Sequence, residues 1–181
     1  MILIVDMNFK KDSLGFYEFV LPIVAVVKSH EDYIVRHFSE ISQEETDNSG
    51  RIILSGTALK DDESLKHVED FDWIKKCGTP ILGICAGMHT IGLVFNSRLR
   101  ECLEIGMKEI RTIKENPLFS STFKAYELHN YSIHTSREFD VLARAEKCVQ
   151  AVKLRGRDVY GVLFHPEVRN QEIIERFILL Q

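Results

Sequence analysis

The stretch Thr79-Pro80-Ile81-Leu82-Gly83-Ile84-Cys85-Ala86-Gly87 runs from an apolar segment into a helix-like one and places a cysteine between two glycines. At a strand-to-helix junction such a cysteine can occupy a tight, strained turn that lifts its sulfur clear of the sheet. The N-terminus of the following helix then favours the thiolate, which otherwise forms with a pKa of about 8.5. The pattern indicates a displayed nucleophile, although a GxCxG match alone is more often a buried structural cysteine.

The segments around this stretch alternate between strand and helix patterns. Strands are predicted at residues 1–6, 32–37, 51–54 and 80–84. Helices are predicted at residues 14–29 and 63–76 and from residue 87, with a polar surface loop at 42–50. The alternation predicts an α/β fold, a three-layer open, mostly parallel sheet with helices on both faces. Active sites in such sheets lie at the carboxyl ends of the strands, which is where Cys85 falls.

The second half contains more strands in succession. They are predicted at residues 107–113, 122–133, 141–145, 149–155 and 159–164, before a closing helix at 171–180. The turn Arg155-Gly156-Arg157-Asp158 is typical of a hairpin, so its two flanking strands are expected to be antiparallel. A small antiparallel addition to the parallel sheet is therefore predicted.

Composition limits the classes of function. With 181 residues and 45% hydrophobic content, the chain can bury one sizeable core, so a single domain over residues 1–181 is expected. A net charge of −4 argues against nucleic-acid binding. The sequence has no run of eighteen apolar residues and no secretory signal pattern, so we expect a cytoplasmic protein without a membrane partner.

The cysteines give no metal or disulfide pattern. The four of them form no CxxC pair and no zinc-ligand spacing with the seven histidines; they are Cys77, Cys85, Cys102 and Cys148. We therefore expect neither a metal site nor a disulfide framework. No GxxxxGK[ST] loop and no GxGxxG after a strand occurs, so no bound cofactor is expected.

A second motif, Tyr160-Gly161-Val162-Leu163-Phe164-His165-Pro166-Glu167, supplies a base and a carboxylate. In an extended segment His165 and Glu167 point to the same side, about 7 Å apart along the chain. Pro166 indicates that the strand ends here, at a rim. Cys85, His165 and Glu167 then have the chemistry of a nucleophilic triad, with His165 as base and Glu167 as its orienter.

Taken together, these motifs resemble those of the class I (triad-type) glutamine amidotransferases, whose fold is flavodoxin-like. The matching blocks are Pro80–Gly87, Gly161–Glu167 and Ile52-Ile53-Leu54-Ser55-Gly56. Order and spacing fit from Arg51 to the C-terminus, whereas the first fifty residues fit poorly. Within the family, Glu138–Ala143 and the compact length are similar to the stand-alone glutaminase subunits of GMP synthase.

An oxyanion hole is needed to stabilise the tetrahedral intermediate of thiolate attack. The N–H of Ala86, directly after the nucleophile, is one natural donor. The resemblance implies Gly56 as the second, although Ser55 and Thr57 stand where the family usually has Gly-Gly-Pro. Loop rigidity is therefore in question, and a partner could be required to form the hole.

The resemblance also implies a substrate-binding set. His89 stands four residues after the nucleophile, where many members carry a glutamine that holds the amino acid end of the substrate. The segment His129-Asn130-Tyr131 matches a stretch that contacts the same group, largely through backbone atoms. His89 could instead be a solvated helix residue, and the strand segment could be core or surface.

The expected function is that of a glutaminase, which converts glutamine into glutamate and ammonia through a cysteinyl thioester. The resemblance implies that the ammonia acceptor is an ATP-dependent synthetase partner, with the one that aminates xanthosine monophosphate (XMP) as first candidate. Two alternatives remain at this point. One is a γ-glutamyl thiol hydrolase of the same fold, and the other is a non-catalytic regulatory relative.

Overall fold

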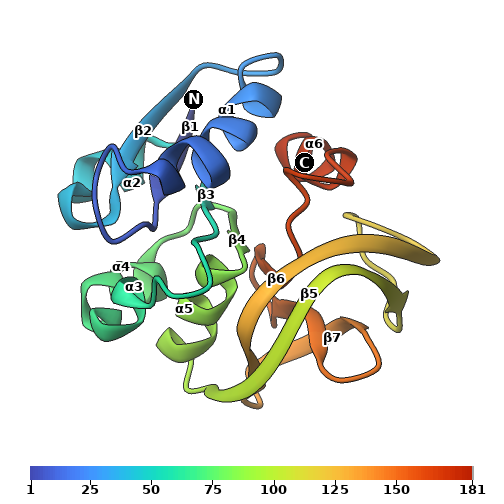
Figure 1. Ribbon diagram of the computed structural model, residues 1–181. Coiled ribbons are helices and arrows are strands. Elements are labelled where there is room, and N and C mark those ends of the chain that lie inside the picture. The colour runs from blue at the N-terminus through green and yellow to red at the C-terminus, as the bar shows by residue number, and fades with distance from the viewer. Residues whose placement is uncertain (181) are drawn as a thin grey trace.

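The computed structural model describes residues 1–180 and contains one nine-stranded sheet with the order β2-β1-β3-β4-β9-β8-β7-β5-β6 (Figure 1). The strands are β1 (Ile2–Asp6), β2 (Tyr33–His37), β3 (Arg51–Leu54), β4 (Ile81–Ile84), β5 (Arg98–Thr112), β6 (Thr122–His134), β7 (Phe139–Arg144), β8 (Val149–Leu154) and β9 (Val159–Val162). The first five in the spatial order are parallel, and every pairing from β9 to β6 is antiparallel. The predicted α/β sheet with an antiparallel addition is confirmed.

The parallel strands are buried on both faces. In β1, Ile2 and Ile4 join one hydrophobic cluster while Leu3 and Val5 join the other, because successive side chains point to opposite faces. Such strands form near-continuous apolar runs, which is why they could be found in the sequence. At the centre, β4 pairs with β9 in parallel, and Ile84 lies opposite Val162.

Helices cover both faces of this sheet (Figure 1). The α-helices are α1 (Leu21–Val27), α2 (Gln43–Asn48), α3 (Glu63–Lys66), α4 (Trp73–Lys76), α5 (Ala86–Val94) and α6 (Glu172–Ile178). Side chains of α1 and α6 pack into one cluster, and those of α4 and α5 pack into the other. Across residues 1–180, no helix combines the length and apolar character needed to cross a lipid bilayer.

Two predicted helices are irregular. The helix predicted at 14–29 spans residues 14–27, with a π-helical stretch at Phe16–Val20 before α1. Pro22 follows this stretch, at whose end the Leu21 N–H donates to the Phe16 carbonyl. The helix predicted at 63–76 is divided into α3, a 3₁₀ turn at Val68–Phe71 and α4, since His67 takes non-helical angles of φ −119° and ψ 38°.

The prediction of a loop at residues 42–50 is wrong, because α2 occupies most of this segment. Ser42 and Glu45 form a capping box, in which the Ser42 hydroxyl accepts from the Glu45 N–H at 3.2 Å. The Glu45 carboxylate accepts from the Ser42 N–H at 3.1 Å. The S-x-x-E signature was present in the sequence, but the segment has few apolar residues to reveal a helical face.

Replacing Ser42 with alanine is expected to destabilise the fold by about 1 kcal/mol, because the cap loses its acceptor. Denaturant unfolding of the two proteins measures this difference. Glu44→Ala, an exposed change in the same helical turn, is the control and should shift stability by less than about 0.5 kcal/mol. Equal effects of the two changes would show that the capping box does not stabilise α2.

The antiparallel half differs most from prediction in β5, which starts at Arg98, nine residues before the predicted Met107. Its first half carries exposed Arg98, Arg100 and Glu101 outside and Cys102 and Glu104 inside, so no apolar alternation marks it as a strand. A register shift between Glu101 and Glu104 interrupts its pairing with β6. The predicted hairpin between β8 and β9 is confirmed as antiparallel.

Candidate active site

Cys85 follows directly after β4 and caps the N-terminus of α5. Its backbone angles are φ 48° and ψ −100°, outside the ordinary regions for a residue with a side chain. Its N–H donates to the Val162 carbonyl of β9 at 2.8 Å, which fixes the strained turn to the neighbouring strand. Strain of this kind costs roughly 1–3 kcal/mol and persists only where surrounding contacts impose it. The backbone of Cys85 thus forms a tight, strained strand-to-helix turn, as the sequence predicted.

The two glycines around Cys85 allow the helix to approach the sheet. A Cβ on Gly83 would lie 2.5 Å from the carbonyl carbon of Gly87. A Cβ on Gly87 would lie 2.7 Å from Cβ of Leu54 in β3. Larger residues at either position would push α5 away and displace Cys85, so the glycines of the motif have a packing role.

His165 and Glu167 lie just beyond β9, which ends at Val162, two residues before the predicted end. The His165 Nδ1 and Glu167 Oε1 atoms are 2.7 Å apart, and both side chains are fully buried. A turn brings them together, with the Val168 N–H donating to the His165 carbonyl at 3.2 Å. The His165 N–H also donates to the Tyr126 carbonyl of β6 at 2.9 Å, which anchors the turn to the antiparallel half.

The neighbours of the His165 ring favour its protonated form. Burial lowers the pKa of His165, but Glu167 and Cys85 outweigh this effect and hold the pKa well above its usual value. The carboxylate occupies Nδ1, and Nε2 is buried with no hydrogen-bond partner among the described residues.

Gly56 packs against both His165 and Cys85. A Cβ on Gly56 would lie 2.6 Å from His165 Cε1 and 3.5 Å from Cys85 Cβ, so its main chain lies beside both side chains. The Ser55 hydroxyl accepts from the Met7 N–H at 3.1 Å and donates to the Gly56 carbonyl at 3.0 Å. These two hydrogen bonds restrain the Ser55-Gly56-Thr57 loop, whose sequence differs from the Gly-Gly-Pro that is usual in the family. Ala86 is the first residue of α5, where N–H groups have no intrahelical acceptor.

A small cavity lies beside Cys85, between the loop after β3 and strand β6. Its volume is about 20 Å³, which accommodates roughly one water molecule. The lining residues are Thr57, Ala58, Leu59, Asp61, Asp62, Leu65, Cys85, Ala86, His89, Leu128, His129, Asn130 and Tyr131. The cavity therefore includes the nucleophile and every residue that the sequence predicted for substrate binding.

His89 is buried rather than solvated. Its Nε2 atom lies 3.0 Å from the Tyr131 carbonyl, which can only accept, so Nε2 carries the proton of the neutral ring. Burial lowers the pKa of His89 to about 4, so the ring is neutral at pH 7. The glutamine position of the family is thus occupied here by an uncharged donor that ties α5 to β6.

This burial predicts a pH-dependent difference from the His89→Gln variant, whose amide can keep the same bond. In the unfolded chain His89 is protonated below about pH 6.5, whereas in the folded chain its ring stays neutral down to about pH 4. As the pH is lowered from about 6.5 to about 4, the free energy of unfolding of the wild type should therefore fall relative to that of the variant, by a total on the order of 3 kcal/mol. Denaturant unfolding at several pH values measures it, and parallel curves for the two proteins would contradict the buried neutral ring.

The segment His129-Asn130-Tyr131 lines the cavity, but its side chains diverge. The His129 side chain points into the interior, where Nδ1 lies 2.8 Å from the Cys102 carbonyl. The Asn130 amide instead donates to the Leu59 carbonyl, between two segments that line the cavity. The backbone of this strand faces the nucleophile, since the Cys85 sulfur lies 3.6 Å from the Leu128 carbonyl.

The sequence analysis did not identify Asp61 and Asp62, which also line the cavity. Asp61 accepts from the Phe9 N–H at 2.7 Å, so it fixes the loop to the N-terminal segment. Burial, and then Asp61, raise the pKa of the Asp62 carboxyl. Their position just after the Ser55-Gly56-Thr57 block was the only signal that could have placed them near Cys85.

Comparison with solved structures supports the fold. A protein assigned to GMP synthase, from Thermoplasma acidophilum, aligns with a TM-score of 0.85 and 25% identity, over 98% of this chain and 92% of that chain. A glutamine amidotransferase from Thermotoga maritima aligns with a TM-score of 0.72 and 19% identity, over 99% and 81% of the two chains. The first alignment includes the N-terminal region that fits the sequence motifs poorly.

Sequence comparison identifies the family. A subunit of the glutamine-hydrolysing GMP synthase of Methanocaldococcus jannaschii is 32% identical over 146 residues, which is 68% of this chain and 78% of the relative. The corresponding subunit of Methanosphaera stadtmanae is 32% identical over 151 residues, 77% of each chain. The family model for class I glutamine amidotransferases matches residues 23–178. This chain belongs to the class I glutamine amidotransferases and is homologous to these GMP synthase subunits.

Proposed function

We propose that this chain is the glutaminase component of an amidotransferase, with Cys85 as nucleophile, His165 as base and Glu167 as orienter. The observation that carries the proposal is the buried 2.7 Å contact between His165 Nδ1 and Glu167 Oε1, beside a cysteine on a strained elbow. A buried carboxylate on Nδ1 fixes the tautomer and stabilises the charged ring. The function requires both properties.

The proposed reaction begins with the Cys85 proton on His165. The thiolate attacks the side-chain amide carbon of glutamine, and the N–H groups of Gly56 and Ala86 stabilise the oxyanion. The C–N bond breaks as His165 returns its proton to the nitrogen, which leaves as ammonia. Water, deprotonated by His165, then hydrolyses the glutamyl thioester, so glutamine and water give glutamate and ammonia.

Substrate recognition is proposed for the cavity residues. Asp61 and Asp62 offer carboxylates to the ammonium group of glutamine, and His89, Asn130 and Tyr131 offer polar atoms around the same space. The His129 side chain is directed away, so only its backbone is available, as expected from the sequence. No cofactor takes part in this scheme.

A synthetase partner is proposed to open the site. The cavity holds about one water molecule, far less than glutamine needs, and the Asn130–Leu59 bond joins two segments that line it. Movement of the loop at 57–62 would break this bond and admit substrate. The relatives named as GMP synthase subunits support an XMP-aminating, ATP-dependent synthetase as the partner that receives ammonia.

The test is a glutaminase assay of the chain with and without the synthetase of its own organism, XMP and ATP. We expect partner-dependent release of glutamate and formation of GMP. Hydrolysis of γ-glutamyl peptides without regard to the partner would instead identify a thiol hydrolase of the same fold. If neither activity occurs with the partner present, the catalytic proposal is wrong.

A further inference from the structure

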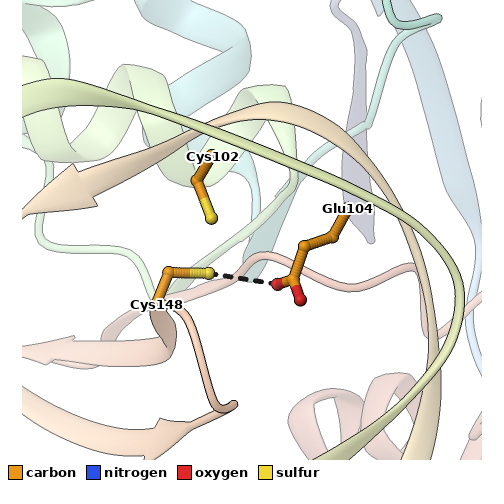
Figure 2. A group of neighbouring side chains, drawn as sticks. All are labelled: Cys102, Glu104 and Cys148. Carbon is orange, nitrogen blue, oxygen red and sulfur yellow. Dashed lines mark hydrogen bonds between the residues drawn. The ribbon is translucent and has the colours of Figure 1, made fainter.

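A second group of reactive side chains, which adjoins the cavity through His129, lies between the curled β5–β6 pair and the start of β8 (Figure 2). It consists of three pairs with a spacing of two residues, so each pair points to one face of its strand. The pairs are Cys102 and Glu104 on β5, Glu127 and His129 on β6, and Cys148 and Gln150 at the start of β8. All six residues are buried. An inward-facing strand position normally carries an apolar residue, so this concentration needs an explanation.

Three of these residues direct ligand atoms to one point. The Cys102 and Cys148 sulfurs and a Glu104 carboxylate oxygen all lie within 4.8 Å of one another. The Cys148 sulfur is 3.3 Å from Glu104 Oε2, the contact drawn in Figure 2. A tetrahedral zinc ion with bonds of about 2.0 to 2.3 Å holds neighbouring ligand atoms roughly 3.3 to 3.8 Å apart. The spacing suits such an ion.

His129 borders this group, although its ring nitrogens are not among the atoms that lie within 4.8 Å of one another. Its Nδ1 atom carries a proton because it lies 2.8 Å from the Cys102 carbonyl, which only accepts. In the neutral ring the lone pair is therefore on Nε2, which is buried and lies 3.7 Å from Glu104 Oε2. Metal-binding histidines commonly donate the other ring N–H to a backbone carbonyl in this way.

The cluster lacks positive charge. Glu104 and Glu127 are both buried carboxylates, and Glu127 Oε2 lies 3.0 Å from His129 Nε2, so a lone pair and a carboxylate face each other unless a proton or a cation separates them. The buried residues of the described chain include no lysine or arginine, so His129 is the only side chain here that could become a cation. Burying carboxylates and thiols without a counter-charge is costly, and a divalent cation would supply it.

We propose that Cys102, Cys148 and Glu104 bind a structural zinc ion between β5 and the start of β8, and that the neighbouring His129 of β6 completes its coordination. Two thiolates with a carboxylate and an imidazole select a borderline-soft divalent metal over magnesium or calcium. Gln150 supports the ligands, since its amide nitrogen lies 3.3 Å from Glu104 Oε2 and 3.4 Å from the Cys148 sulfur. Binding releases the thiol protons and joins strands that are distant in sequence.

The first experiment measures metal in the purified full-length chain. Elemental analysis is expected to give about one zinc per chain, retained after dialysis. Cys102→Ser and Cys148→Ser should each lower the zinc content at least about tenfold, and Gln150→Ala should weaken binding by roughly 10–100-fold. Cys77→Ala is the matched control, since Cys77 is also buried but lies outside the cluster, and its zinc content should equal wild type.

A second measurement needs no variant that could misfold. Wild-type protein stripped with a chelator and titrated with Co²⁺ should develop thiolate-to-cobalt absorption and the intense visible bands of a tetrahedral site. Added Zn²⁺ should bleach them. Absence of both zinc and a cobalt spectrum in folded wild type would overturn the proposal, as would a Cys102–Cys148 disulfide or equal metal loss in Cys77→Ala. None of these readouts depends on glutaminase activity.

Discussion

Replacing Cys85 with alanine is expected to lower glutamine hydrolysis by more than roughly 10⁴-fold, because no other group near the cavity can form the thioester. Measurement of glutamate release with the synthetase partner present tests this. The same change should abolish covalent labelling by a glutamine-mimicking diazoketone, detected as a mass increase of the intact chain. Cys85 is only 4% exposed, but the change to alanine removes a single sulfur atom, so the variant should still fold.

Cys77→Ala is again the matched control, since it removes a buried sulfur that does not line the cavity and should keep both activity and labelling. Labelling of the Cys85→Ala protein at another cysteine would assign the nucleophile elsewhere. Full hydrolysis without Cys85 would contradict the thioester mechanism outright. Loss of both signals in Cys85→Ala alone would establish the nucleophile.

Glu167→Gln is expected to lower kcat by roughly 10²–10⁴-fold with little change in KM. The glutamine side chain is neutral, so it no longer stabilises the imidazolium, and its amide can turn an N–H toward Nδ1 and select the wrong tautomer. Since Glu167 is the first of the groups that raise the pKa of His165, the variant should have a lower His165 pKa. The pH profile of kcat/KM and the NMR titration of the ring detect that shift.

Glu172→Gln provides the control for removing one negative charge nearby in sequence, since this exposed residue begins α6. It should leave both rate and pH profile unchanged. A Glu167→Gln protein with wild-type kcat would mean that the 2.7 Å contact is structural. A reduced rate with an unshifted His165 pKa would assign Glu167 a role in packing alone.

Much of this architecture could be predicted from the sequence because the parallel strands are buried on both faces. Runs such as Ile2–Val5 and Ile52–Leu54 have no other explanation than central strands. The Cys85 elbow and the His165-Pro166-Glu167 turn were equally visible, since each combines residue types that only a few local geometries accept. The distance between these two motifs, however, depends on the order of the strands in the sheet, which no local sequence pattern predicts.

The segments that could not be predicted carry polar side chains on their inward-facing positions. The first half of β5 turns Cys102 and Glu104 inward, so the apolar alternation that marks a strand is absent there. The cluster proposed to bind zinc was hidden for a related reason. Its residues lie up to 46 positions apart along the chain, and only the pairing of β5 with β6 and the contact of β6 with β8 bring them together.

The parallel pairing of β4 with β9 has a consequence for how this active site tolerates evolutionary change. Cys85 and His165, the proposed nucleophile and base, follow two adjacent strands whose register is fixed, with Ile84 opposite Val162, so main-chain bonds set their separation. Apolar side chains in these strands can therefore be replaced by other apolar side chains without changing the separation of Cys85 and His165. A one-residue insertion within either strand cannot be absorbed, because it would invert every side chain beyond it and turn the reacting group to the opposite face.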